Sequence, residues 1–235
     1  MILDKRLYLS KMSIFEVLTA DDLTELDHIS PISHFKAIPK GIIIQKPEGA
    51  KDGLFFLKEG KLRLYRENLE GKQFTVGILS KGNIFGEIDT FSFGTKGLYI
   101  ETMDETLICS VPKKAFEDFL SERPLLSLKM LTELSKILKE RDEMLEKLTL
   151  GDVQDRILHL LLKLSERFGV EDEGKVRIDL QLTHQEVANM VGATREAVSG
   201  ILKKLMKDGV INTGRKSISI YPIKVADILE LTYTM

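Results

Sequence analysis

The side chains with the clearest chemical potential lie between residues 182 and 223. Arg195, Glu196 and Ser199 offer hydrogen-bond donors and acceptors on one side of a predicted helix. Lys203 adds a positive charge on the same side. Because the opposite side of this helix is apolar, the polar groups are expected to face outward, near the helix end that would enter a DNA major groove. The residue types and their spacing therefore predict contact with double-stranded DNA.

A helix, a tight turn, a second helix and a short hairpin are predicted to hold these side chains in place. Thr183 and Glu186 have the T-x-x-E spacing of a capping box, which starts the first helix. Gly192 supplies the permissive backbone of the turn, and Thr194 is a suitable cap for the second helix. The apolar sides of the two helices consist of Val187, Met190, Val191, Ala197, Val198, Ile201, Leu202 and Leu205. This order of elements predicts a winged helix-turn-helix.

The charge of this segment differs from that of the whole chain. The 235 residues carry a formal net charge of −2, whereas residues 183–224 hold seven basic side chains and three acids, a local charge of +4. The basic residues are Arg195, Lys203, Lys204, Lys207, Arg215, Lys216 and Lys224. A basic patch on a near-neutral protein is typical of phosphate contacts. The alternative, two amphipathic helices packed as ordinary structure, explains neither the patch nor the ordered turn glycine and hairpin.

The amino-acid composition limits the classes of protein to which this chain could belong. With 43% hydrophobic and 30% charged residues, the chain is typical of a soluble globular protein, and its length suits two domains. It has neither an apolar run that could span a bilayer nor a secretory signal at its start, so a cytoplasmic location without a membrane partner is expected. Cys109 is the one cysteine, which excludes an internal disulfide and a cysteine-held cluster, and it is expected to be a buried filler. No metal or cofactor is predicted.

In the N-terminal half, the sequence predicts one short helix followed by an all-β domain. That helix is expected near residues 13–29, with Thr19 and Asp22 spaced as its cap. Residues 34–111 consist of short β-rich runs separated by glycine turns, which predict an antiparallel sandwich or barrel.

A long helix is predicted from Pro124 to near Thr149, with a heptad seam along it. The seam consists of Leu131, Leu134, Leu138, Leu145 and Leu148. Such a seam favours a coiled-coil homodimer, with Arg141 at its one missing position. The alternative is that the helix packs only on its own β-domain, for which Met130, Ile137 and Met144 provide a second apolar row. A hinge is expected at Gly151 and Asp152.

This β-roll, long helix and winged helix-turn-helix, in that order, resemble the CRP/FNR transcription regulators over about residues 15–222. The most specific motifs are LTHQEVANMVGATREAVSGIL, FLKEGKLRLY and GNIFGEI. The resemblance implies an α+β fold with a cyclic-nucleotide-binding-type β-roll over residues 1–123, a dimerisation helix over 124–150 and a DNA-binding domain over 151–235. It also implies a homodimer on a near-palindromic operator, with RNA polymerase as a further partner.

The resemblance assigns roles within the DNA reader. Arg195 would donate two hydrogen bonds to guanine O6 and N7, Glu196 would accept from the N4 amine of cytosine, and Ser199 would touch a third base. Gly200 departs from the pattern, because many relatives carry a second base-reading arginine there. The expected phosphate contacts are Thr183, His184, Gln185, Thr194, Lys203, Arg215 and Lys216.

The sensor segment follows the resemblance only in part. Where cyclic-nucleotide-binding members carry an Arg-Ser pair for the phosphate, this chain has Gly97 and Leu98. A lysine one position earlier could donate only a point charge. The candidate effector pocket consists of Gly86, Glu87, Ile88 and Lys96. cAMP is therefore not the expected effector, and a different small molecule or none at all remain as alternatives.

The sequence leaves two other functional classes as alternatives. A regulatory ligand-binding module that controls a partner protein would use the same β-roll, but here a complete DNA reader follows the roll. An enzyme is disfavoured because the sequence contains no G-x-S-x-G, no H-E-x-x-H and no phosphate-binding loop of the Walker type. The sequence thus favours a homodimeric, sequence-specific transcription regulator.

Overall fold

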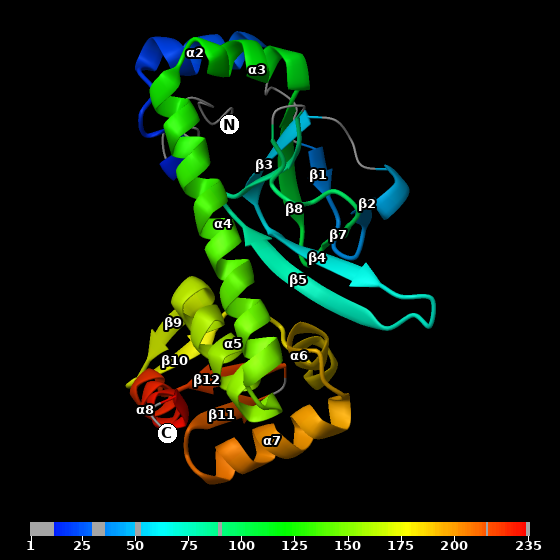
Figure 1. Cartoon of the computed structure of the whole chain (residues 1–235), viewed down its shortest axis with the longest axis vertical. Coiled ribbons are helices and arrows are strands. Elements are labelled where there is room, and N and C mark those ends of the chain that lie inside the picture. The colour runs from blue at the N-terminus through cyan, green and yellow to red at the C-terminus, as the bar shows by residue number, and fades with distance from the viewer. Residues whose placement is uncertain (1–11, 30–35, 50–52, 89–90, 215, 234–235) are drawn as a thin grey trace. The chain divides into compact units, whose positions relative to one another are not determined.

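The structure is a computed structural model that describes five stretches of the chain (Figure 1). They are residues 12–29, 36–49, 53–88, 91–214 and 216–233. The chain forms two compact units, Met1–Glu140 and Arg141–Met235. The division falls within the long helix α4, Pro124–Leu150. A sheet-rich N-terminal part, a long helix and a C-terminal helix-turn-helix confirm the predicted α+β class.

The predicted opening helix is shorter than expected. A single 3-10 turn, η1 (Ser13–Phe15), precedes α2 (Ala20–Ile29). The backbone N–H of Thr19 donates to Asp22 Oδ2 at 2.8 Å, and the Asp22 N–H donates to Thr19 Oγ1 at 3.2 Å. These reciprocal bonds confirm the predicted cap. Because they make Thr19 the start of α2, the helix cannot extend back to Ser13.

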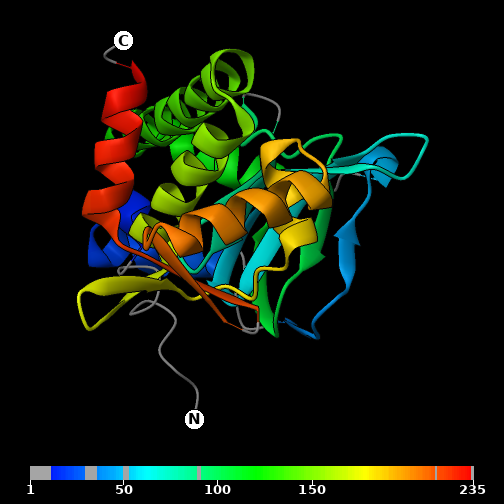
Figure 2. The same ribbon diagram turned by 90° about the horizontal axis from the view of Figure 1, so that it is seen from below.

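Two four-stranded antiparallel sheets form the roll of the first unit, with strand orders β1-β8-β3-β6 and β2-β7-β4-β5. The strands of the first sheet are β1 (Lys36–Ile38), β8 (Thr106–Val111), β3 (Gly53–Glu59) and β6 (Ile84–Glu87). Those of the second are β2 (Ile43–Gln45), β7 (Tyr99–Thr102), β4 (Lys61–Glu67) and β5 (Gln73–Ser80). The short turn η2 (Pro47–Gly49) follows β2. The predicted antiparallel β-domain is confirmed, and Figures 1 and 2 show the β4–β5 hairpin projecting from it.

Both faces of the first sheet are covered by apolar side chains. One cluster joins the two sheets and contains Leu57, Leu62, Leu64, Phe85, Leu98, Ile100 and Ile108. The rings of Phe55 and Phe85 stack at its edge, with centroids 5.1 Å apart. A second cluster lies under α2, α3 (Lys113–Ser121) and the first turns of α4. Cys109 is buried in this second cluster, as expected for a core filler.

Helix α4 carries two apolar rows, of which one remains exposed in the single chain. Leu131, Leu138 and Leu145 are 59%, 62% and 61% exposed. Met130 is buried in the second cluster of the first unit, and Leu134 and Ile137 pack partly against that cluster. Leu148 is half-buried. The second row therefore serves the β-domain as predicted at its first two positions, whereas the exposed leucines have no cover from their own chain.

The second unit combines helices with a small antiparallel sheet of order β11-β12-β10-β9. Its helices are α5 (Val153–Phe168), α6 (His184–Val191), α7 (Arg195–Lys207) and α8 (Pro222–Tyr233). Its strands are β9 (Gly169–Asp172), β10 (Lys175–Ile178), β11 (Ile211–Gly214) and β12 (Ser217–Ile220). The β11–β12 hairpin is the predicted wing. Helix α8, which was not predicted, contacts α5 and buries Val225.

Candidate DNA-binding interface and sensor site

The start of α6 is held by the capping box that the sequence predicts. The Glu186 N–H donates to Thr183 Oγ1 at 3.2 Å, and the Thr183 N–H donates to Glu186 Oε2 at 2.5 Å. Gly192 ends the helix in the left-handed region, at φ 65° and ψ 38°. Thr194 then caps α7 by accepting a hydrogen bond from the Ala197 N–H at 3.2 Å. These local bonds fix the turn between the two helices.

The buried side of α7 is narrower than predicted. Val198, Leu202 and Leu205 are buried, and they lie four and then three residues apart, as one helical stripe requires. Ala197 is exposed and Ile201 is only half-buried. The assignment of Ala197 to the core was therefore wrong, because its position lies about 100° around the helix from Val198.

The outer side of α7 presents polar groups, as expected. Arg195, Glu196 and Lys203 are exposed, and Ser199 is half-buried. Gly200 is also exposed, and a Cβ built there meets no atom within 4 Å. The start of α7 thus exposes a guanidinium and a carboxylate, and there is open space at Gly200 where a side chain could be accommodated.

A contact between the two helices links residues that were predicted separately. His184 Nδ1 and Ser199 Oγ lie 2.7 Å apart. The first residue of α6 is thereby bonded to the middle of α7. Their separation of 15 positions across a turn gave no sequence signal for this pair.

The other candidate phosphate contacts lie at the start of α6 and on the wing. Gln185 is exposed, and its Nε2 donates to Asn189 Oδ1 at 2.9 Å. Lys216 is exposed at the wing turn, with a left-handed φ of 57°. Arg215 lies outside the described residues.

Two lysines of the basic patch form hydrogen bonds with other residues of the second unit. Lys204 Nζ donates to Gln154 Oε1 of α5 at 2.9 Å. Lys224 Nζ donates to the carbonyl oxygen of Gly209, also at 2.9 Å. The side chains of Lys203 and Lys216 remain as the better candidates for phosphate.

In the first unit, Glu87 is the last residue of strand β6, and its carboxylate forms hydrogen bonds with Thr95 of the same chain. Its Oε1 accepts hydrogen bonds from the backbone N–H and the hydroxyl of Thr95, both at 3.1 Å. The Gly86 N–H donates to the same hydroxyl at 3.1 Å. Gln45 Nε2 donates to the Thr95 carbonyl oxygen at 2.8 Å and to that of Leu98 at 3.3 Å. Thr95 is only 1% exposed and is the centre of this network.

Thr95 and Gln45 were not among the predicted pocket residues. Two residues that were predicted, Ile88 and Lys96, lie in different surroundings. Ile88 is buried in the second hydrophobic cluster, and Lys96 is exposed. Gly86 is required for packing, because a Cβ there would lie 2.2 Å from the carbonyl oxygen of Gly53 and its φ is +110°. The structure brings Gly86 and Glu87 together at Thr95 and places Ile88 and Lys96 in different surroundings.

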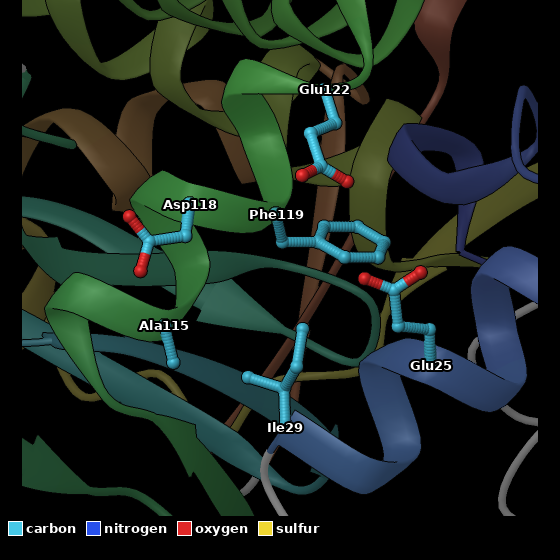
Figure 3. Close-up of a pocket in the computed structure, with 6 residues that line it drawn as sticks. All are labelled: Glu25, Ile29, Ala115, Asp118, Phe119 and Glu122. Carbon is cyan, nitrogen blue, oxygen red and sulfur yellow. The ribbon is translucent and has the colours of Figure 1, made fainter.

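A hollow of about 320 Å³ lies between α2 and α3 (Figure 3). Its lining consists of Glu25, Ile29, Ala115, Asp118, Phe119 and Glu122. Arg123 donates to Glu25 Oε2 at 2.5 Å, and its guanidinium lies 3.7 Å from the centre of the Phe119 ring. The lining includes no residue that the sequence assigned to a site.

Comparison with known proteins places both units in recognised families. Residues 35–123 match the cyclic nucleotide-binding domain family, and residues 155–224 match the Crp-like helix-turn-helix domain family. Among the residues that the structure describes, none of the helices combines the length and the hydropathy that a membrane span requires.

Similar proteins of known role match most of the chain. The global nitrogen regulator of Synechocystis sp. is 30% identical over 177 residues, which cover 74% of this chain and 79% of that protein. The CRP-like cAMP-activated global transcriptional regulator of Mycobacterium tuberculosis is 29% identical over 182 residues, covering 77% of this chain and 81% of the relative.

Solved structures show the same fold. A mutant of CooA from Carboxydothermus hydrogenoformans has a TM-score of 0.71 at 25% identity and covers 85% of this chain and 89% of its own. A CRP/FNR-family transcription regulator from Thermus thermophilus has a TM-score of 0.69 at 27% identity, with coverage of 84% and 98%.

Proposed function

This chain belongs to the CRP/FNR family of DNA-binding transcription regulators, and from that premise we propose how its own residues read DNA. Homodimeric operator binding is typical of the family, and we propose it for this chain on a near-palindromic operator. The observation that carries the proposal is the exposed polar start of α7, set on a helix-turn-helix with a wing.

We assign base reading to α7. Arg195 is exposed and can donate two parallel hydrogen bonds to guanine O6 and N7, while Glu196 can accept from the cytosine N4 amine. Ser199, one turn further along, touches a third base. Because Gly200 has no side chain, the usual second arginine contact is missing, and the operator should differ from that of relatives at this position.

Phosphate contacts hold the reader in register. The first turn of α6 offers backbone N–H groups together with Thr183, His184 and Gln185. Thr194, Lys203, Arg215 and Lys216 supply the remaining contacts. These interactions add affinity for every sequence and make binding dependent on salt concentration.

The dimer is proposed to form along α4. Leu131, Leu138 and Leu145 repeat every seven residues and are about three-fifths exposed in one chain, so a second copy of α4 would cover them. Leu134 and Leu148 flank this row on the same helix. A twofold dimer carries two copies of α7, one for each half of a palindrome.

We propose that the first unit binds a ligand other than cAMP, or that it binds no ligand. The M. tuberculosis relative is cAMP-activated, but in this chain the Glu87 carboxylate is bonded to Thr95. Gly97 and Leu98 stand where the resemblance expects the arginine and serine that would hold a phosphodiester, and Lys96 offers only a flexible point charge. We also propose RNA polymerase as a further partner of this protein, and the cytoplasm as its location.

Binding-site selection tests the proposal. The full chain is incubated with duplexes that carry a randomised centre, and the bound duplexes are sequenced, with and without cAMP. A near-palindromic consensus that does not require cAMP is expected. The matched control is the Arg195→Ala, Glu196→Ala double variant, which should retain salt-sensitive binding without that consensus. Absence of any consensus for the wild-type chain would contradict the proposed base reading.

A further inference from the structure

The start of α6 and the middle of α7 are joined by one side-chain hydrogen bond. His184 Nδ1 lies 2.7 Å from Ser199 Oγ. His184 is exposed and Ser199 is half-buried, so neither residue is enclosed in the core of the second unit. The proposed function gives these residues separate tasks, phosphate contact for His184 and base contact for Ser199. Their bond means that neither side chain acts alone.

We propose that His184 orients the hydrogen of the Ser199 hydroxyl and thereby decides which bases Ser199 reads; this inference rests on the proposed DNA-binding function. A serine hydroxyl can donate or accept, so by itself it discriminates poorly among base edges. When Nδ1 carries no hydrogen, it accepts the hydroxyl hydrogen of Ser199. The serine oxygen then offers only lone pairs to the groove.

A serine hydroxyl whose hydrogen points to Nδ1 can recognise only hydrogen-bond donors on the bases, which are their amino groups. It accepts from N4 of cytosine or N6 of adenine, which are the major-groove donors of these bases. Guanine O6 and N7 and thymine O4 are acceptors, so each would face the serine lone pairs without a hydrogen between them. The pair therefore favours cytosine or adenine at the base that Ser199 faces.

The second ring nitrogen sets the tautomer. A neutral imidazole has one donor nitrogen and one acceptor nitrogen, and the bond made by one determines the role of the other. His184 is the first residue of α6, where a phosphate is expected, and a phosphate oxygen can only accept. Nε2–H donation to phosphate leaves Nδ1 as the acceptor for Ser199. A backbone contact that carries no sequence information thus orients a group that does. His184 is a positioning residue, and Ser199 is the reading residue.

Binding-site selection with four full-length chains tests the pairing: the wild type, His184→Ala, Ser199→Ala and the double variant. The wild type should enrich cytosine or adenine at one position of each half-site. His184→Ala should reduce that enrichment about fivefold or more, on the scale of one base-specific hydrogen-bonding contact. In the Ser199→Ala background, His184→Ala should change the base preference no further.

The neighbouring residue supplies the matched control. Gln185 is exposed at the same helix start, and its amide bonds to Asn189 of α6 rather than to α7. Gln185→Ala should weaken binding to all sequences alike and leave the preferred base unchanged. An equal loss of base preference in Gln185→Ala and His184→Ala would overturn the proposal, because general weakening would then explain both.

A second measurement reports the tautomer directly. Nitrogen NMR of the imidazole of His184 in the full chain bound to its selected duplex should show Nδ1 without a hydrogen and Nε2 with one, with the Nδ1 resonance displaced in Ser199→Ala. A protonated Nδ1 in the neutral ring would overturn the proposed pairing. In the selection, a wild type that enriches no sequence would overturn the proposed DNA-binding function. Enrichment that His184→Ala leaves unchanged would overturn only the coupling between the two residues.

Discussion

The carboxylate of Glu87 is bound twice by Thr95, through its backbone N–H and its hydroxyl, each at 3.1 Å. Thr95 is almost completely buried, and its hydroxyl also accepts from the Gly86 N–H. Glu87 is one of the residues that the sequence assigns to the candidate effector pocket. In this structure its carboxylate belongs to a polar network internal to the roll.

Thr95→Val should destabilise the first unit while keeping the shape of the side chain. It leaves the buried Gly86 N–H without its hydrogen-bond acceptor and leaves Glu87 Oε1 with only the backbone N–H of residue 95, which costs about 1–3 kcal/mol of the free energy of unfolding. Urea unfolding measures this loss. Thr95→Ser keeps the hydroxyl and serves as the control. Equal urea midpoints for wild type and Thr95→Val would show that the network contributes little.

Arg195 and Lys216 should give different signatures in DNA binding. Arg195→Ala is expected to relax the base preference at one position, at a cost of about 1–3 kcal/mol for the preferred base. Lys216→Ala should weaken all sequences alike and reduce the slope of log affinity against log salt by about 1. Fluorescence anisotropy across a salt series distinguishes the two effects. Arg66→Ala, which removes an exposed cation of the first unit, is the control that should change neither quantity.

Gly200 is expected to be a stability defect in α7. It lies within the helix, and a Cβ there meets no atom within 4 Å, so Gly200→Ala should stabilise the second unit by about 0.5–1 kcal/mol. Thermal unfolding of the full chain measures the gain. Gly192→Ala should act in the opposite direction, because its φ of +65° suits glycine. A destabilised Gly200→Ala variant would mean that this position has a packing role that the structure does not show.

The exposed row of α4 predicts the oligomeric state. Leu138→Glu should shift the chain from dimer to monomer in sedimentation equilibrium, because it places a charge at the centre of the proposed seam. The free energy of unfolding of the first unit should change little, since Leu138 is already 62% exposed. Lys139→Glu adds an acid one position away and should leave the dimer intact. A dimer that survives Leu138→Glu would argue for another interface.

Local signals predicted the DNA reader well. The capping box of Thr183 and Glu186, the turn at Gly192 and the cap at Thr194 each depend on a few neighbouring residues, and all three are present. Helix α8 was missed, although Pro222 at its first position is a start signal that could have identified it.

Contacts between distant positions were beyond sequence reasoning. The His184–Ser199 bond depends on how α6 and α7 cross, and the Gln45–Thr95 bond joins residues 50 positions apart. Ala197 was a different kind of error, because the sequence placed it on the buried side of α7 and the structure exposes it. A small apolar residue at the edge of a helical stripe can face either side, and only packing decides.

His159 on α5 predicts an acid-sensitive step in stability. Burial lowers the pKa of His159 below its ordinary value of 6.5, and the positive charges of Lys163 and Lys147 lower it further. In the unfolded chain this ring takes up a proton as the pH falls below about 6.5, whereas in the folded chain it stays neutral until a lower pH. The unfolded state then binds more protons, so the free energy of unfolding falls with decreasing pH over this window. His159→Gln removes the titrating ring and should show a smaller drop in urea midpoint between neutral pH and the lower end of the window. Parallel pH profiles for the two chains would show that other groups cause the acid sensitivity.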